Sequence, residues 1–238
     1  SNIRMPPMGG YYFIRRIVMI DNRLVIAIDG PAGAGKSTIA KKVGEILNIE
    51  YIDTGAMYRA LTLKVVKSNI NSDDEERIVE LMEDTSIYFK DNHIYLDGTR
   101  VDEEIRKNII NNNVSSVAKI PKIRELMVKM QQELSNSHNL IMDGRDIGTV
   151  VLPNANFKFF ITASIEERAN RRYKELIEKG EKDISYSQIL EEIKKRDKID
   201  STREIAPLIK SSDAYEIDTT NKTVEQCVDE MINIIEGR

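Results

Sequence analysis

The stretch Gly30-Pro31-Ala32-Gly33-Ala34-Gly35-Lys36-Ser37-Thr38 decides the fold, and the apolar run 24–28 comes just before it. The run predicts a buried strand, and the stretch fits the G-x-x-x-x-G-K-[ST] pattern of a phosphate-binding loop between a strand and a helix. Its glycines allow backbone N–H groups to surround phosphate oxygens at the helix N-terminus. Lys36 is expected to reach the β- and γ-phosphates, and the Ser37 hydroxyl is expected to face Mg²⁺. The stretch therefore predicts a nucleoside-triphosphate site.

The overall composition limits the class of protein. The chain has 238 residues, with 35 Lys and Arg against 39 Asp and Glu, and a net charge of −4. This length suits one α/β domain with an insertion, and the acidic balance argues against a nucleic-acid-binding protein. The single cysteine, Cys227, excludes an internal disulfide framework and a cysteine metal cluster. We therefore expect a cytoplasmic protein without a nucleic-acid partner.

Residues 1–22 are expected to form an extension that is disordered or derived from cloning. An added edge strand or a contact with a partner is the alternative. The apolar part, 11–20, is too short to span a bilayer and contains Arg15 and Arg16. It also lacks the small-residue cleavage pattern of a signal peptide. No membrane association is therefore expected.

Strand and helix patterns alternate along the chain after the loop. Further strands are expected at 51–52, 140–142, 157–161 and 214–218, and helices at about 37–47, 56–66, 123–134, 164–177, 187–199 and from 223 onward. The alternation predicts an α/β fold with three layers, in which helices cover both faces of a five-stranded, mostly parallel sheet. Ligands of such sheets bind beyond the carboxyl ends of the strands. The polar clusters 29–37, 53–59 and 143–146 follow strands, so we expect them at this one rim.

The region 85–102 departs from the alternation. Three short aromatic or β-branched runs, 87–90, 93–96 and 99–101, are separated by Asp91-Asn92 and Asp97-Gly98. Such dipeptides are typical of tight turns between antiparallel strands. We therefore expect a small antiparallel sheet inserted into a core that consists of 23–84 and 103–238.

The segment Ser72-Asp73-Asp74-Glu75 precedes this insert. It has the Ser-x-x-Glu spacing of a capping box, in which the serine side chain caps a helix and the glutamate reaches back to it. We therefore expect a helix that opens at Ser72 and ends at about residue 84.

Arginines in two settings indicate an anionic acceptor. Arg59 and Arg145 come just after predicted strands, at the rim that also holds the phosphate-binding loop. The spacing of Arg196, Asp200 and Arg203 places all three on one helix face. Guanidinium groups bind phosphate oxygens in a two-pronged way, and phosphoryl transfer depends mainly on positioning and charge neutralisation. The alternative for these helix arginines is a solvated, ion-paired surface.

Four stretches together resemble the bacterial cytidylate kinases, a family of nucleoside-monophosphate kinases. They are 29–37, 53–59, 143–151 with Pro153, and 196–203 with 206–208. The first is shared by many kinases, whereas the other three in this order are specific to this family. The resemblance runs from Leu24 to the C-terminus. It implies transfer of the γ-phosphoryl group of ATP, with Mg²⁺, to CMP or dCMP. It also implies a monophosphate-binding insert at about 85–102 and a mobile helical lid at about 168–186.

The resemblance also implies roles for single residues. The acceptor phosphate would be held by Arg59, Arg145 and Arg203. The cytosine edge would be read by Ser115, or by Ser116 if the register differs by one, and by Arg124 and Asp146. The sugar would lie near Tyr58, Arg196 and Asp200, and Thr54 is assigned to the same acceptor site. The transferring phosphoryl group would be neutralised by Lys36, Arg145, Arg168 and Arg172. Asp143 would contact Mg²⁺ or one of its waters.

The base reading has a physical reason. A carboxylate at Asp146 accepts a hydrogen bond from the N4 amino group of cytosine, whereas uracil would place a carbonyl oxygen there. An unpaired buried polar group costs about 1–3 kcal/mol, which predicts that UMP is a substrate about 10- to 100-fold poorer than CMP.

Three other functions compete with this interpretation. One is a P-loop kinase for another nucleoside monophosphate or a small metabolite, because Arg59, Arg124 and Arg145 suit anionic acceptors generally. A GTP-driven switch is disfavoured, because Asn221-Lys222-Thr223-Val224 lacks the aspartate of the guanine-reading pattern Asn-Lys-x-Asp. A nucleic-acid-binding role is disfavoured by the acidic chain. We expect the enzyme to act as a monomer.

Overall fold

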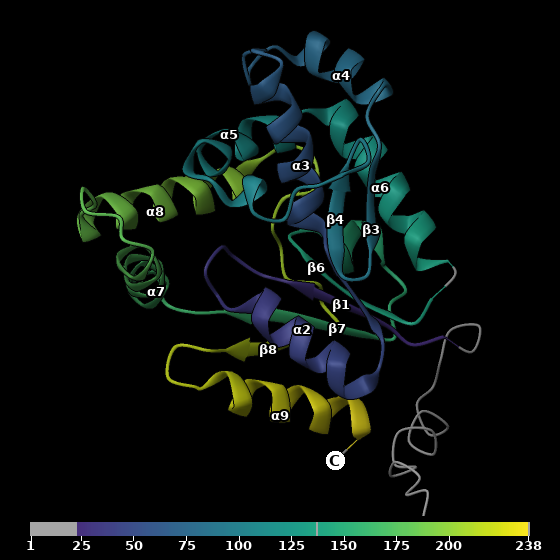
Figure 1. Cartoon of the computed structure of the whole chain (residues 1–238). Helices are drawn as coiled ribbons and strands as arrows, with labels where there is room; N and C mark the ends of the chain where they lie inside the picture. Colours follow the sequence, from purple (N-terminus) through teal and green to yellow (C-terminus); the bar gives the residue numbers. More distant parts are fainter. Residues whose placement is uncertain (1–22, 137, 238) are drawn as a thin grey trace, which may run out of the picture.

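The computed structural model describes residues 23–136 and 138–237, and Figure 1 shows their arrangement. The expected N-terminal extension, 1–22, lies outside the described residues. In chain order the elements are β1 (Val25–Asp29), α2 (Lys36–Leu47), β2 (Glu50–Asp53), α3 (Thr54–Lys67), α4 (Glu75–Glu83), β3 (Ile87–Lys90), β4 (His93–Leu96), β5 (Thr99–Arg100), a 3-10 turn (Glu104–Arg106), α5 (Asn108–Lys119), α6 (Pro121–Ser135), β6 (Leu140–Gly144), a π-helical turn (Ile147–Val151), β7 (Phe157–Thr162), α7 (Ile165–Glu178), α8 (Tyr186–Thr202), β8 (Tyr215–Asp218) and α9 (Val224–Glu236).

The central sheet has five parallel strands in the order β2-β6-β1-β7-β8. β6 lies between β1 and β2, so its last residues are flanked by the ends of both strands. In register, Asp29 of β1 is opposite Gly144, and Asp53 of β2 is opposite Asp143. The three polar clusters therefore meet at one rim, and the prediction of a five-stranded parallel α/β sheet is confirmed.

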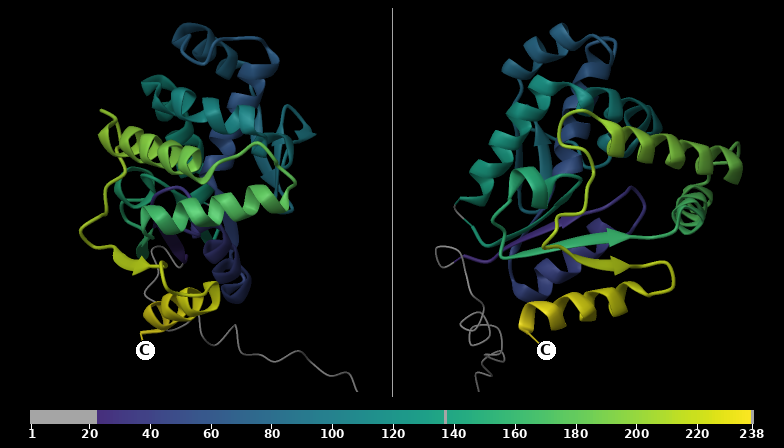
Figure 2. Two further views of the ribbon diagram at one scale, coloured as in Figure 1. Left: turned by 90° about the vertical axis from the view of Figure 1, so that its left-hand side faces the viewer. Right: turned by 180° about the vertical axis from the view of Figure 1, so that it is seen from behind.

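Helices cover both faces of this sheet (Figures 1 and 2). Strand β1 is fully buried, and its side chains alternate between the two faces, as the period of a strand requires. Ile26 and Ile28 pack in a core with α2 and α9, and Val25 and Ala27 pack on the other face with the π-helical turn. A run of five apolar residues is thus explained by burial from two sides.

The small antiparallel sheet, with strand order β3-β4-β5, is also present as predicted. Its buried residues Ile87, Ile94 and Leu96 do not pack on the central sheet. They share a separate core with α3, α4, α5 and α6, which includes Leu61 and Met127. The insert of 85–102 is thus one part of a larger packing unit that surrounds α3.

Helices α7 and α8, which include the expected lid, pack against each other at one side of the molecule (Figure 2). Their contact contains a small apolar core formed by Ala169, Leu176, Ile189 and Ile193. None of the helices described for this chain is long and apolar enough to cross a membrane.

Two local features differ from the sequence-based expectations. The capping box at Ser72 is wrong: α4 begins at Glu75, and the Asp74 side chain caps it by accepting from the backbone N–H of Arg77. The Ser72 hydroxyl instead donates to Asn113. The π-helical turn Ile147–Val151 was not predicted, because its start depends on a carboxylate from another strand, described below.

Candidate active site

The phosphate-binding loop connects β1 to α2, where the sequence predicts it. Gly30 is required by space, since a Cβ atom there would lie 1.9 Å from the carbonyl oxygen of Ile161. Gly35, with φ at 92°, precedes α2, and no described side chain caps that helix. Its first backbone N–H groups are thus free for an anion. The Lys36 ammonium donates to the carbonyl of Pro31 at 2.8 Å, across the loop.

Lys36 is buried beside other cationic groups. Burial lowers its pKa well below the usual lysine value, the guanidinium of Arg145 lowers it further, and Asp143 acts in the opposite direction. Arg196 also disfavours the charged lysine. Positive groups of the donor loop and of the predicted acceptor site therefore lie close enough to repel each other. A phosphate group placed between them would relieve this repulsion.

The carboxylates of Asp143 and Asp53 lie at the rim next to the phosphate-binding loop. Asp143 is 2% exposed, and its two oxygens accept from the Ser37 hydroxyl at 2.9 Å and the Tyr51 hydroxyl at 3.1 Å. Burial raises the pKa of Asp143 to about 7, and the neighbouring charge of Asp53 adds to this effect. The Thr54 hydroxyl donates to the Asp143 carbonyl at 2.7 Å. Thr54 thus ties the start of α3 to the end of β6.

Asp200 on α8 organises the predicted acceptor-phosphate arginines. Its Oδ2 accepts from Arg145 Nε at 2.9 Å, and its Oδ1 lies 3.9 Å from Arg203 Nη1. Arg203 also donates to the Ala206 carbonyl at 2.7 Å. The buried Nη2 of Arg203 has no hydrogen-bond partner among the described residues. This group is a donor available to a ligand oxygen.

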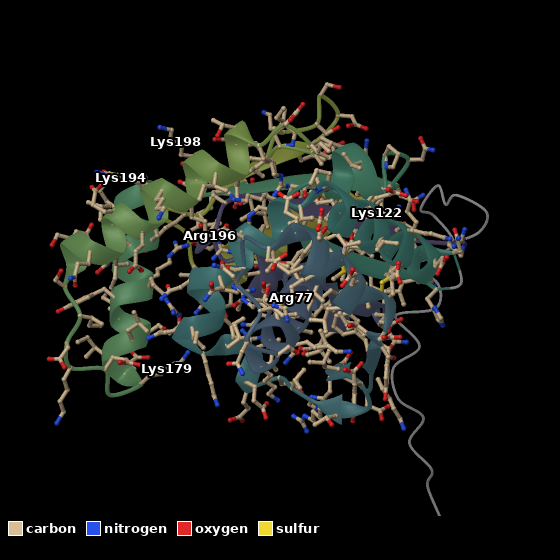
Figure 3. All side chains as sticks on the ribbon, turned by 90° about the horizontal axis from the view of Figure 1, so that it is seen from above. Arg77, Lys122, Lys179, Lys194, Arg196 and Lys198 are labelled. Carbon is tan, nitrogen blue, oxygen red and sulfur yellow. The ribbon has the colours of Figure 1, made fainter. Side chains whose placement is uncertain are left out.

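Arg196 and Arg59 complete the cationic cluster. Burial lowers the pKa of Arg196 to about 9, and Arg145 and Arg59 contribute by repulsion. Burial also lowers the pKa of Arg59, although Asp53 opposes it. Figure 3 shows Arg196 on the inner face of α8, whereas Lys194 and Lys198 lie on its outer face. The face of α8 that carries Arg196 is therefore turned to the site, and Asp200 of the same helix also bonds to Arg145 there. The predicted shared helix face does not extend to Arg203, because α8 ends at Thr202 and Arg203 is its C-cap residue with an extended backbone.

The predicted base-reading pair is formed inside the protein. Arg124 of α6 donates to the Asp146 carboxylate, and both side chains are almost fully buried. The Arg124 guanidinium carbon lies 5.4 Å from the centre of the Tyr58 ring, a cation–π contact. Arg124 also donates to the carbonyl of Ala118 on α5, the helix that carries Ser115. These contacts join the elements that carry the predicted base-reading residues Ser115, Arg124 and Asp146, and also α3, which carries Tyr58.

The two predicted lid arginines have different surroundings. Arg168 is 5% exposed and forms two hydrogen bonds with the Asp197 carboxylate, at 2.9 and 2.6 Å. It also donates to the carbonyl of Ala32 in the phosphate-binding loop at 3.2 Å. Arg172 is more exposed and pairs with Glu175 at 2.9 Å. Arg168 therefore links α7 and α8 to the loop, whereas Arg172 is partly exposed and lies close enough to Arg59 for the two charges to repel each other.

Several residues of the site were not assigned by the sequence analysis. Tyr51 holds Asp143, and Asp197 holds Arg168. Arg171 donates to Thr219, whose hydroxyl donates to the Ala34 carbonyl in the loop at 2.9 Å. The family motif includes Asp197, but a position in the sequence does not show which arginine it meets.

The fold and this site define the class of the protein. A phosphate-binding loop, an adjacent hydroxyl–carboxylate pair and a cluster of arginines at one rim of a parallel sheet are the parts of a P-loop kinase. A crystal structure of an uncharacterized protein from Eubacterium ventriosum has a TM-score of 0.52 and 16% identity. It covers 91% of this chain and 100% of that chain. That likeness concerns the fold alone.

Sequence comparison narrows the class. The cytidylate kinase family model matches residues 26–237. The cytidylate kinase of Clostridioides difficile strain 630 is 55% identical over 212 residues, which are 89% of this chain and 98% of the relative. That of Clostridium botulinum strain Langeland is 57% identical over 210 residues, 88% of this chain and 96% of the relative. The chain belongs to the cytidylate kinase family, so the predicted resemblance is confirmed.

Proposed function

We propose that this protein transfers the γ-phosphoryl group of ATP to CMP and dCMP, giving CDP and dCDP. Family membership supports this function, as does the cluster of Arg59, Arg145, Arg196 and Arg203 beside Lys36. The observation that carries it is the buried cationic cluster, in which Arg203 Nη2 has no hydrogen-bond partner among the residues that the structure describes, because such a cluster suits an anionic acceptor next to the donor phosphates. A general metabolite kinase would not need the Arg124–Asp146 pair.

The donor side holds the triphosphate through backbone and Lys36. Residues Gly30 to Thr38 surround its phosphates, and Lys36 moves from the Pro31 carbonyl to the phosphate oxygens. Arg168 and Arg172, from α7, add positive charge around the transferring group. The acceptor phosphate oxygen attacks in line, and the arginines neutralise charge at both nucleotides as the phosphoryl group passes between them.

The site suits Mg²⁺. Magnesium prefers oxygen ligands, and the Ser37 hydroxyl and Asp143 carboxylate lie 2.9 Å apart at the loop. We assign Ser37 as a ligand and Asp143 as a contact to the ion or its waters. Bound with ATP, the ion neutralises charge on the β- and γ-phosphates. Tyr51 keeps the Asp143 carboxylate turned toward Ser37.

The cytosine base lies against Arg124, Asp146 and Ser115 in this proposal. Asp146 accepts from the N4 amino group, while the hydrogen bond from Arg124 holds the Asp146 carboxylate in place. The sugar lies near Tyr58, Asp200 and Arg196, and Thr54 belongs to the same acceptor site. An aspartate facing the 2′ position accepts from a hydroxyl there and tolerates its loss, which accounts for use of both CMP and dCMP. We also propose that the enzyme acts in the cytoplasm as a monomer.

The test is a panel of acceptors with ATP and Mg²⁺. We expect CMP and dCMP to be phosphorylated, and kcat/KM for UMP to be about 10- to 100-fold lower than for CMP. Asp146→Asn should reduce this difference, because an amide presents both a donor and an acceptor. Asp102→Asn, on the small sheet, is a matched control that should leave the ratio unchanged. Equal kcat/KM for UMP and CMP in the unmodified enzyme would contradict the base assignment, and activity on none of the three would contradict the function.

A further inference from the structure

We propose that Asp29, the last residue of β1, is a positioning residue that holds Arg145 and Asp146 in place for the acceptor nucleotide. The side chain of Asp29 is almost fully buried, at 4% exposure. Its Oδ1 accepts from the backbone N–H of Ile147, and its Oδ2 accepts from that of Gly148, each at 2.7 Å. These two N–H groups belong to the residues that directly follow Arg145 and Asp146.

The segment after β6 needs this support from outside. Ile147 and Gly148 begin the π-helical turn Ile147–Val151, whose first N–H groups have no partners within the turn. The preceding residue, Asp146, does not cap the turn with its own side chain, which is bound by Arg124. Asp29 therefore performs the capping from a neighbouring strand, 118 residues earlier in the chain. It fixes the backbone just beyond the two acceptor residues.

This arrangement joins the two halves of the site. Asp29 immediately precedes Gly30, the first residue of the phosphate-binding loop, and is opposite Gly144 in the sheet. The Asp29 carboxylate therefore fixes the position of Arg145 relative to the donor loop. Phosphoryl transfer depends on the distance and angle between two nucleotides, and a displacement of about 1 Å lowers rates as much as a hundredfold. A rigid link between the loops has a direct use in this chemistry.

Fold stability alone does not account for a carboxylate at this position. Burial raises the pKa of Asp29 to about 6, and the two N–H groups only partly offset that. A buried charge of this kind is a costly way to hold a turn. Two equivalent acceptor oxygens, directed at two successive N–H groups, are what a carboxylate offers and an amide does not.

The first test is Asp29→Asn, which replaces one acceptor oxygen by an NH₂ group that faces a backbone N–H. The inference rests on the proposed function, so activity is measured with CMP as acceptor. We expect kcat/KM for CMP to fall about 10- to 100-fold, KM for ATP to change less than about threefold, and the preference for CMP over UMP to decrease. The control is Asp74→Asn, since Asp74 also caps a backbone N–H group, that of Arg77, but does so at the start of α4, away from the site. It should change none of these values.

A second variant approaches the same contact from the other side. A Cβ atom on Gly148 would lie 3.3 Å from Asp29 Oδ2 and 3.2 Å from Lys158 Cδ, so Gly148→Ala should displace the turn slightly while keeping the carboxylate. It should show the same selective loss toward CMP. Gly148→Ala decides the matter if Asp29→Asn does not fold, as judged by its thermal melt.

The possible results distinguish the positioning role of Asp29 from the proposed function of the enzyme. A folded Asp29→Asn or Gly148→Ala enzyme with unchanged kcat/KM for CMP, or with equal losses toward CMP and ATP, would overturn the positioning role. An unmodified enzyme that does not phosphorylate CMP would contradict the proposed function instead. Selective loss toward CMP and reduced discrimination against UMP, with ATP binding retained, would support the role of Asp29.

Discussion

The donor side and the acceptor side of this site are built in opposite ways. The donor side is one continuous stretch, 30–38, and its contacts are mostly backbone, as in the bond from Lys36 to the Pro31 carbonyl. The acceptor side gathers charged side chains from α3, α6, β6 and α8 and the loop after β6, and they hold one another, as in the pairs Arg124–Asp146 and Arg145–Asp200. The donor loop therefore takes its phosphate-binding groups from one short stretch, which contacts from Asp143, Arg168 and Thr219 hold in place, whereas the acceptor groups are brought together only by the tertiary fold.

The two sides should consequently respond differently to mutation. A change in the donor loop removes a group that meets phosphate directly, and the rest of the fold has little to rearrange. A change on the acceptor side leaves a buried charge without its partner, which affects stability as well as binding.

The largest effect is expected at Lys36. Lys36→Met removes a preorganised positive charge from the transferring phosphoryl group, so kcat should fall about 10²- to 10³-fold, with CMP binding within a few fold of normal. The control is Lys42→Met on the same helix, an exposed lysine paired with Glu225. Steady-state kinetics and calorimetry of CMP binding measure both values. A Lys36→Met enzyme with normal kcat would remove Lys36 from the chemistry.

Arg145→Ala should show the combined effect expected of the acceptor side. We expect kcat/KM for CMP to fall about a hundredfold, ATP binding to be retained, and the free energy of unfolding to fall by about 3 kcal/mol, because the Asp200 carboxylate loses its closest partner. Adding Asp200→Ala should recover only part of this stability, because Arg196 and Arg203 then lose the same carboxylate, and it should not restore activity. If the single variant is as stable as the unmodified protein, the pair is not an important buried contact.

The difference between contacts within a short stretch and contacts between distant residues also explains what the sequence could predict. The loop, the five strands and the antiparallel insert were found because glycines, apolar runs and turn dipeptides act over a few residues. The sequence could not show that Asp143 meets Tyr51 and Ser37, or that Arg145 meets Asp200, since 55 to 106 residues separate the partners in these three pairs. The contacts of Asp143 follow from β6 lying between β1 and β2, and the contact of Arg145 depends on where α8 packs.

Local patterns also left an ambiguity of two residues in where α4 begins. Ser72 and Asp74 are both good helix caps, and their local spacing favoured Ser72, but Ser72 bonds instead to Asn113 on α5. The roles of Arg59, Ser115 and Arg203 came from the family resemblance rather than from spacing. They stay predictions, supported by the unpartnered Nη2 of Arg203 and by the surroundings of Arg59.

The variant Asp143→Asn tests whether the buried Asp143 carboxylate beside the donor loop lowers the stability of the fold. Its pKa is raised to about 7, so the native state binds this proton more tightly than the unfolded chain, and the burial cost is present in full only above pH 7. Asp143→Asn should therefore stabilise the fold at pH 8 while lowering activity.

The pH dependence provides the check on that prediction. The stability gained by Asp143→Asn should shrink as the pH falls from 7 toward 4, because the native carboxyl of the unmodified protein becomes protonated and neutral in that range. Urea denaturation at several pH values measures this. Asp229→Asn, at an exposed position of α9, should give no comparable gain. A gain that is independent of pH would show that the Asp143 charge is not its cause.

The smallest effect on stability is expected at Arg172, and it separates the two lid arginines. Arg172 pairs with Glu175 at a partly exposed position, so Arg172→Ala should change the free energy of unfolding by less than about 1 kcal/mol. Arg168→Ala should cost about 3 kcal/mol, because it leaves Asp197 without a partner that forms two hydrogen bonds with it. If both arginines neutralise the transferring group, kcat should fall at least tenfold in each variant despite this difference in stability. A stable Arg172→Ala enzyme with normal kcat would limit the lid's contribution to Arg168, whose contacts with Ala32 and Asp197 already place it at the donor loop.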